Sequence, residues 1–150
     1  WSGFVEDLFG GGRVVEVLVA PDSETIVVQY LTSELASRSP WTSTKAYTKV
    51  PKTRPVSFVR VLRTGGTRTQ FIDTPTLTLE SWANDAITAS NLAQMVRGLM
   101  FAIDRVTYSG HLYQFYDPQE FSGPANLPDP DSAQERYTET FSVGVRATAV

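Results

Sequence analysis

The sequence predicts an α+β fold in which two helices pack on a mainly antiparallel sheet. Two stretches repeat apolar side chains at helical spacing, and several others are rich in β-branched residues or alternate apolar with polar ones. The order lacks the repeated strand–helix alternation of a parallel α/β fold. At 150 residues, 41% of them hydrophobic, the chain is long enough for one domain with one core, which we place at residues 21–150.

Residues 1–20 are predicted to form an arm outside this domain. Gly10, Gly11 and Gly12 suit a hinge, and the β-branched run at residues 14–19 suits an extended strand. Because no hairpin partner is near in the sequence, one interpretation is that this run pairs with the sheet edge of another subunit. The arm lacks the basic and apolar regions of a signal peptide, so we expect a cytoplasmic protein.

The first helix is expected at residues 23–38. Asp22 or Ser23 caps its N-terminus, and Pro40 enforces its end. Its apolar stripe consists of Val27, Val28, Leu31 and Leu35.

The next part of the chain is predicted to be a β-meander. Residues 46–50 form a short strand, and residues 56–63 form a second strand that ends at a hairpin turn of Gly65 and Gly66. The return strand begins at residues 70–72 and continues through residues 77–82.

The second helix gives the strongest periodic pattern. It begins after Asn84 or Asp85, and its apolar positions are Ala89, Leu92, Ala93, Val96, Leu99, Met100 and Ile103. Two strands follow, at residues 112–121 and 137–149. The last should have a buried side, with Phe141, Val143 and Val145, and a solvated side with Thr138, Thr140 and Ser142.

A long loop is expected between these two strands, at residues 122–132. It exceeds the length that a hairpin needs, and loops of this kind usually serve a function. We therefore expect it to dock a partner through Pro124, Leu127 and Pro128.

No residue pattern predicts catalysis, a metal or a cofactor. The chain has no cysteine and one histidine, His111, for which the sequence offers no catalytic partners. Asp117 and Glu120 lie three residues apart on a strand, so they face opposite sides. The longest apolar run, residues 17–20, is too short to span a bilayer.

Charged residues are unevenly distributed along the chain. Between Lys45 and Ile72 there are seven basic residues and no acidic one, whereas between Asp73 and Glu139 ten acidic residues accompany three basic ones. Ordinary solvated surfaces would explain this distribution. Two sharper hypotheses are contact with nucleic acid phosphates and charge pairing between neighbouring copies. In the second, Arg54, Arg60, Arg63 and Arg68 face Asp117, Glu120, Asp129 and Asp131 of the next copy.

The order and spacing of several segments together carry a resemblance. These segments are Pro21-Asp22, residues 27–31, Phe58-Val59-Arg60-Val61, residues 63–66, residues 77–83, Ser122-Gly123-Pro124, Leu127-Pro128-Asp129-Pro130 and Arg136-Tyr137. Together they resemble the tail terminator proteins of long-tailed phages (siphophages), especially those that infect actinobacteria. The resemblance runs from Pro21 to the C-terminus, so the arm lies outside it.

The resemblance implies a structural virion protein that binds other proteins and is not an enzyme. Proteins of this kind form a ring, usually a hexamer, on the head-proximal end of the tail tube. The ring ends polymerisation of the major tail tube protein and presents a docking surface to the head-side connector, and DNA passes through its lumen without specific binding. Two alternatives stay open. One is another neck ring protein, such as a head-completion or tail-tube subunit, and the other is a small nucleic-acid-binding module that uses Trp41, Tyr47 and Phe58 for stacking.

Overall fold

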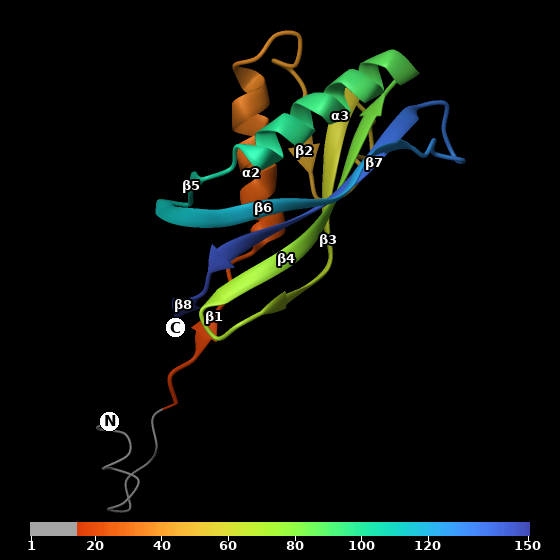
Figure 1. Cartoon of the computed structure of the whole chain (residues 1–150). Helices are drawn as coiled ribbons and strands as arrows, with labels where there is room; N and C mark the ends of the chain where they lie inside the picture. The colour runs from red at the N-terminus through yellow and green to blue at the C-terminus, as the bar shows by residue number, and fades with distance from the viewer. Residues whose placement is uncertain (1–14) are drawn as a thin grey trace, which may run out of the picture.

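The computed structural model of the chain describes residues 15–150 and confirms an α+β fold. Six strands form one curved sheet in the order β2-β3-β4-β7-β6-β5, and all neighbours are antiparallel except β2 and β3 (Figure 1). The elements are β1 (Leu18–Val19), α2 (Ser23–Ala36), β2 (Lys45–Tyr47), β3 (Ser57–Arg68), β4 (Ile72–Ala83), α3 (Ala86–Phe101), β5 (Arg105–Tyr108), β6 (His111–Asn126), β7 (Glu135–Arg146) and β8 (Thr148–Ala149).

Both helices begin at the aspartates that the sequence indicates. Asp22 caps α2 by accepting hydrogen bonds from the Thr25 amide (3.3 Å) and hydroxyl (2.8 Å). Asp85 caps α3 in the same way, with both bonds from Thr88 at 2.8 Å. These bonds satisfy amides that the first turn of a helix leaves without intrahelical partners.

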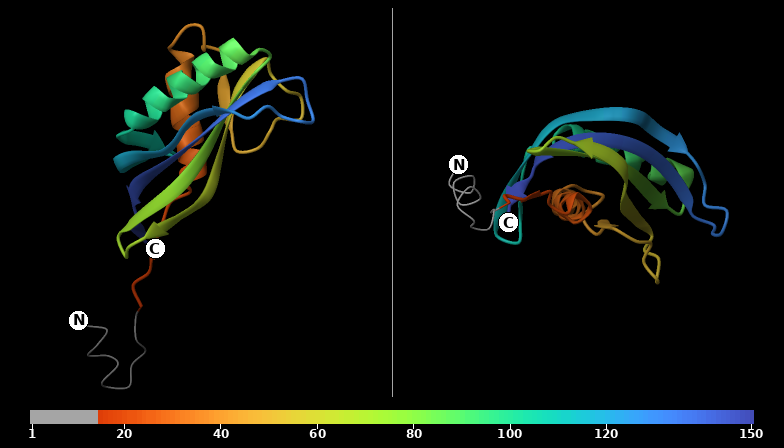
Figure 2. Two further views of the ribbon diagram at one scale, coloured as in Figure 1. Left: turned by 45° about the vertical axis from the view of Figure 1, so that its right-hand side comes forward. Right: turned by 90° about the horizontal axis from the view of Figure 1, so that it is seen from below.

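The core lies between the helices and the concave face of the sheet (Figure 2). It contains Leu31 and Leu35 from α2 and Leu92 and Val96 from α3, which share one cluster with Val59, Leu77, Leu79, Phe141 and Val143 from the sheet. Each large apolar side chain buried in this way contributes about 1.5–3 kcal/mol. The apolar stripe predicted for α3 is buried, although Ile103 lies just beyond the end of the helix.

The predicted hairpin turn at Gly65 and Gly66 is wrong. Both residues lie inside β3, with positive φ values of 149° and 123°, at a shift in the pairing register with β4. The chain reverses at residues 69–71 instead. A glycine pair can mark an irregularity within a strand as well as a turn, because both need backbone angles that other residues avoid.

A second hairpin, between β5 and β6, brings His111 to the start of β6. Ser109 and Gly110 form its turn with φ values of 51° and 75°, which is typical of tight two-residue connections. Strand β6 then continues to Asn126, so the first part of the predicted long loop is strand. The connection to β7 spans residues 127–134.

The last strand is central in the sheet, and its expected solvated side is partly closed. Strand β7 pairs with both β4 and β6. On the side expected to be solvated, Ser142 is buried and Thr138 and Thr140 are half-buried. Strand β7 ends at Arg146, and after Ala147 the chain forms the short strand β8, which pairs with β1. The described part of the arm therefore finds its strand partner in its own chain, because the C-terminal residues return to it. The predicted glycine hinge lies outside the described residues.

Candidate functional site

The single histidine lies at the surface of the molecule. His111 is exposed at the start of β6, where its ring lies 4.5 Å from that of Tyr113. Among residues 15–150 no three metal-ligating side chains lie close enough together to hold an ion. Neither helix in this part of the chain is long and apolar enough to cross a membrane.

Asp117 and Glu120 make contacts in different places. Asp117 lies at a bulge of β6 with a φ of 48°, and its carboxylate accepts a hydrogen bond from Gln119 Nε2 (2.7 Å). Glu120 instead binds Arg97 on α3 through two hydrogen bonds of 2.6 and 2.7 Å. The pair therefore offers no acid–base site.

Three of the four arginines expected at an interface bind carboxylates of their own chain. Arg54 lies 3.1 Å from Asp129, Arg60 lies 3.5 Å from Glu80, and Arg63 makes two hydrogen bonds of 2.7 and 2.9 Å to the buried Asp73. Contact of these arginines with a neighbouring copy stays a prediction. The side chains of Lys45, Lys49 and Lys52 are exposed and form no ion pair within the described part of the chain.

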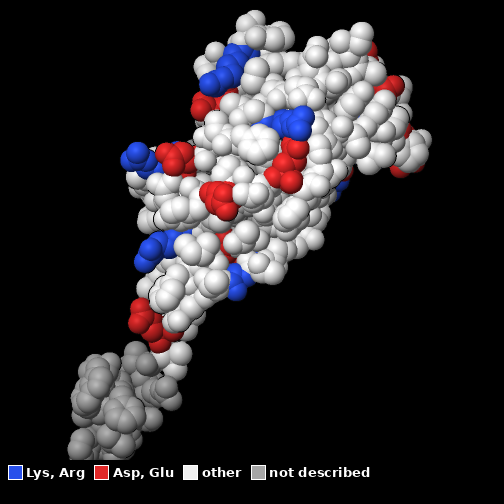
Figure 3. Space-filling view, viewed as in Figure 1, with Lys and Arg blue, Asp and Glu red and all other residues white. Residues whose placement is uncertain are grey.

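Opposite charges lie close together on the surface. On the face in Figure 3, Lys and Arg side chains are interspersed with Asp and Glu, and no large patch carries one sign. Folding pairs part of the basic stretch with carboxylates, because β3 lies next to β4 and brings Arg60 beside Glu80 and Arg63 beside Asp73.

Trp82 forms an aromatic cluster on the helix-free side of the sheet that the sequence did not indicate. Its ring stacks on Phe58 with centroids 5.2 Å apart, and the guanidinium groups of Arg54 and Arg136 each lie 5.3 Å from its centroid. Trp82 is 2% exposed, so the cluster closes part of this face. Residues from several strands and a loop contribute to it, which explains why no local pattern predicts it.

The connection between β6 and β7 is anchored next to this cluster. Asp129 binds Arg54, which also lies over Trp82, and Gln134 Nε2 donates to the Pro55 carbonyl (3.0 Å). Leu127, Pro128 and Asp131 remain exposed at the surface, whereas Pro124 lies within β6 and is half-buried. The connection is thus held at its base and presents an uncharged pair, Leu127 and Pro128.

Two stretches of the sheet edge carry features that discourage added strands. Beyond β5, strand β6 contains Pro118 and Pro124, and its pairing with β7 on the inner side shifts register three times. On β3, the Arg63 amide donates to Glu24 Oε2 (2.6 Å), so a helix side chain occupies this position of the edge. Proline, bulges and occupied amides all discourage edge pairing, which favours contacts through side chains.

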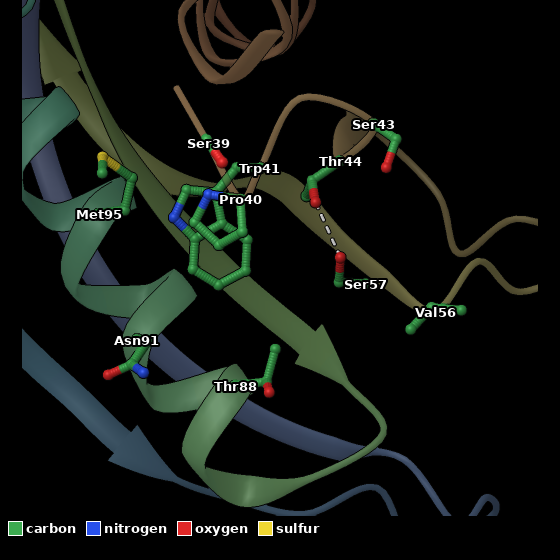
Figure 4. Close-up of a pocket in the computed structure, with 10 residues that line it drawn as sticks. All are labelled: Ser39, Pro40, Trp41, Ser43, Thr44, Val56, Ser57, Thr88, Asn91 and Met95. Atoms are coloured by element: carbon green, nitrogen blue, oxygen red, sulfur yellow. Dashed lines mark hydrogen bonds between the residues drawn. The ribbon is translucent and has the colours of Figure 1, made fainter. Parts of the chain in front are cut away.

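A hollow of 770 Å³ opens between the loop after α2, the start of β3 and α3 (Figure 4). Its apolar lining consists of Pro40, Trp41, Val56 and Met95. Hydroxyl groups and one carboxamide complete the wall, from Ser39, Ser43, Thr44, Ser57, Thr88 and Asn91. Thr44 Oγ1 and Ser57 Oγ share a hydrogen bond of 2.8 Å, and none of the lining side chains is charged. Such a hollow suits an uncharged partner.

Comparison of the chain with models of known protein families and with curated proteins finds no match.

Proposed function

We propose that this chain is a structural virion subunit that forms a ring on the head-proximal end of a phage tail tube. The ring, which the resemblance implies to be a hexamer, ends polymerisation of the tube protein and offers a docking surface to the head-side connector. The observation that carries the proposal is the placement of exposed large apolar side chains. Val17, Val19 and Phe71 lie near one end of the molecule, and Val56 borders the hollow at the other.

Two separate apolar surfaces are what a ring subunit requires. In a cyclic ring each copy contacts one neighbour with one surface and the other neighbour with a different surface. Exposed apolar side chains mark sites of protein contact where they gather into one patch, as Val17, Val19 and Phe71 do, whereas single ones elsewhere on the surface, such as Ile87 and Phe121, are ordinary. The sequence similarity from Pro21 onwards supports the same assignment.

The nucleic-acid-binding alternative has less support. Arg54, Arg60 and Arg63 lie against carboxylates, and Phe58 is completely buried, so neither the charge nor this aromatic ring is free for a nucleic acid strand. Another neck ring protein would share the surfaces described here. The identity of the partner therefore distinguishes the two ring proteins.

The test is to purify the protein, measure its mass in solution, and image it with tail tubes by electron microscopy. A tube terminator binds one end of each tube and stops its elongation, whereas a tube subunit joins along the tube. A monomer that leaves tube growth unchanged would contradict the proposal. His111→Ala serves as a control that should keep full capping, because the exposed ring has no catalytic setting.

A further inference from the structure

The turn of the β3–β4 hairpin, residues 69–71, presents an exposed aromatic side chain on a tightly bonded backbone. Phe71 is 52% exposed. The Thr69 amide donates to the Ile72 carbonyl (2.8 Å), the Ile72 amide donates to Thr69 Oγ1 (3.1 Å), and the Phe71 carbonyl accepts from the Ala147 amide (2.8 Å). These polar groups are satisfied inside the chain, so a partner can cover the turn without leaving them unpaired. We call residues 69–71 the tip turn.

Arg68 fixes the tip turn from the side. Its guanidinium donates to the carbonyls of Thr69 (3.0 Å) and Gln70 (2.9 Å), and to that of Leu18 on β1 (3.2 Å). One side chain therefore ties the turn to the N-terminal strand. A surface held in this way loses little conformational entropy when a partner binds it, which favours affinity.

The tip turn and the hollow lie at opposite ends of the molecule, as the hairpin and the loop after α2 show (Figures 1 and 2). The tip turn of one chain cannot reach the hollow of the same chain, but it can reach the hollow of a second copy. The two features also match in chemistry, because Thr69, Gln70 and Phe71 are uncharged and the hollow has no charged side chain. The volume of 770 Å³ is within the range of pockets that enclose ligands larger than one side chain, about 300–1,000 Å³.

We infer that the tip turn of one copy inserts Phe71 into the hollow of the next copy and so joins the subunits of the ring. Phe71 enters between Trp41 and Met95, and Asn91 and the hydroxyl groups of the wall provide hydrogen bonds for the Gln70 side chain. The contact is head-to-tail, so it repeats from copy to copy until the ring closes. This inference rests on the proposed function, because it assumes that copies of the chain assemble.

Engineered cysteines test the contact directly, since the chain has no cysteine of its own. The variant with Gln70→Cys and Asn91→Cys, which keeps Phe71, is treated with a short bis-maleimide and separated on a denaturing gel. We expect a ladder of covalent oligomers that ends at the size of the ring. Two matched controls replace one position each: Phe121→Cys with Asn91→Cys uses a residue that is 67% exposed on β6, and Gln70→Cys with Gln94→Cys uses an exposed position of α3 outside the hollow.

The solution mass of the unmodified protein separates the possible failures. A protein that is monomeric at every concentration contradicts both the ring and the contact. If the protein is an oligomer but the variant with Gln70→Cys and Asn91→Cys gives no ladder, or the same ladder as the controls, the contact alone is contradicted and the proposed function stands.

Single substitutions give a second test. Phe71→Ser should weaken association of the copies at least about tenfold, because a buried phenylalanine is lost from the interface, whereas Phe121→Ser should leave it unchanged. Arg68→Ala should weaken association of the copies although the Phe71 side chain is still present, because Arg68 acts by positioning the tip turn. Association of Phe71→Ser equal to that of the unmodified protein would overturn the inference.

Discussion

Arg97 and Glu120 join helix α3 to strand β6 through two short hydrogen bonds, from Nε to Oε2 (2.6 Å) and from Nη2 to Oε1 (2.7 Å). A second carboxylate, that of Glu139 on β7, lies near this pair and is 1% exposed. Neither of its oxygens has a hydrogen-bond partner in the part of the chain that the structure describes. Burial, and secondly the charge of Glu120, raise the pKa of Glu139 from 4.5 to about 8, although Arg97 opposes the shift.

The first prediction follows from this raised pKa. Between pH 4.5 and about 8 the unfolded chain ionises Glu139 while the folded chain keeps it protonated, so stability falls as pH rises through this interval. The Glu139→Gln variant has no ionisable group at this position, so its stability should not fall over this interval. Near pH 8 its free energy of unfolding should exceed that of the unmodified protein by about 4 kcal/mol. Urea unfolding at a series of pH values measures this difference. Asp131→Asn, at an exposed position, is the control that should leave the pH dependence unchanged.

The second prediction compares two arginines that both have carboxylate partners. Arg63→Ala leaves Asp73, whose side chain is 2% exposed, without its partner and should cost about 2 kcal/mol. Arg38→Ala removes an ion pair in which both side chains are about 40% exposed, and should change stability by less than about 0.5 kcal/mol. If urea unfolding shows equal losses in the free energy of unfolding for the two variants, burial of Asp73 does not determine the cost of losing its arginine partner.

The third prediction compares the two glycines of β3. A Cβ at Gly66 would lie 2.8 Å from Pro75 Cα and 2.9 Å from the Thr76 nitrogen, whereas a Cβ at Gly65 would meet nothing within 4 Å. Both residues have positive φ, so both substitutions by alanine strain the backbone. Gly65→Ala should cost about 1 kcal/mol, and Gly66→Ala about 3 kcal/mol because β4 must also move. Similar midpoints of thermal unfolding for the two variants would contradict this ranking.

The fourth prediction concerns the exposed lysines. If the uncharged contact between the tip turn and the hollow joins the copies, replacing Lys45, Lys49 and Lys52 by Glu should leave the oligomeric mass unchanged at about 0.05 M and about 0.5 M salt. The unmodified protein should also bind DNA weakly. The dependence of its affinity on salt concentration should correspond to the release of at most about three counterions.

Light scattering and filter binding on the same two proteins check both points. A mass that falls as salt rises, and falls further in the variant, would instead support charge pairing between copies. Tight binding of DNA by a salt-indifferent monomer would favour the nucleic-acid-binding module.

The elements that the sequence predicts well are those defined by local contacts. Helix α3 needs only its cap at Asp85 and its apolar spacing, so its extent follows from residues that are near each other in the chain. The hairpin turn was misplaced because Gly65 and Gly66 satisfy the requirements of a bulge as well as those of a turn. With the turn misplaced, the pairing of Arg63 with Asp73 across the hairpin could not be derived.

The surfaces depend on contacts between distant segments, so the sequence indicates less about them. Glu120 meets Arg97 only because α3 lies over β6, and the hollow combines the loop at residues 39–44 with a helix that begins more than 40 residues later. Charge counts along the chain predicted basic and acidic surfaces that face neighbouring copies. The fold places Arg60 and Arg63 beside Glu80 and Asp73 across two paired strands, and Arg54 beside Asp129 where two loops meet, which counts along the chain do not reveal. Contact with neighbouring copies stays a prediction.

The position of β7 determines how the chain must complete its folding. Residues 135–146 are the last of the large sheet to leave the ribosome, yet they lie between β4 and β6, which are made earlier. Until they arrive, the strands on either side have unpaired inner edges, and the ten residue pairs between β4 and β7 cannot form. A nascent chain that stalls before residue 135 therefore lacks the centre of its sheet and exposes unpaired strand edges, which favour aggregation.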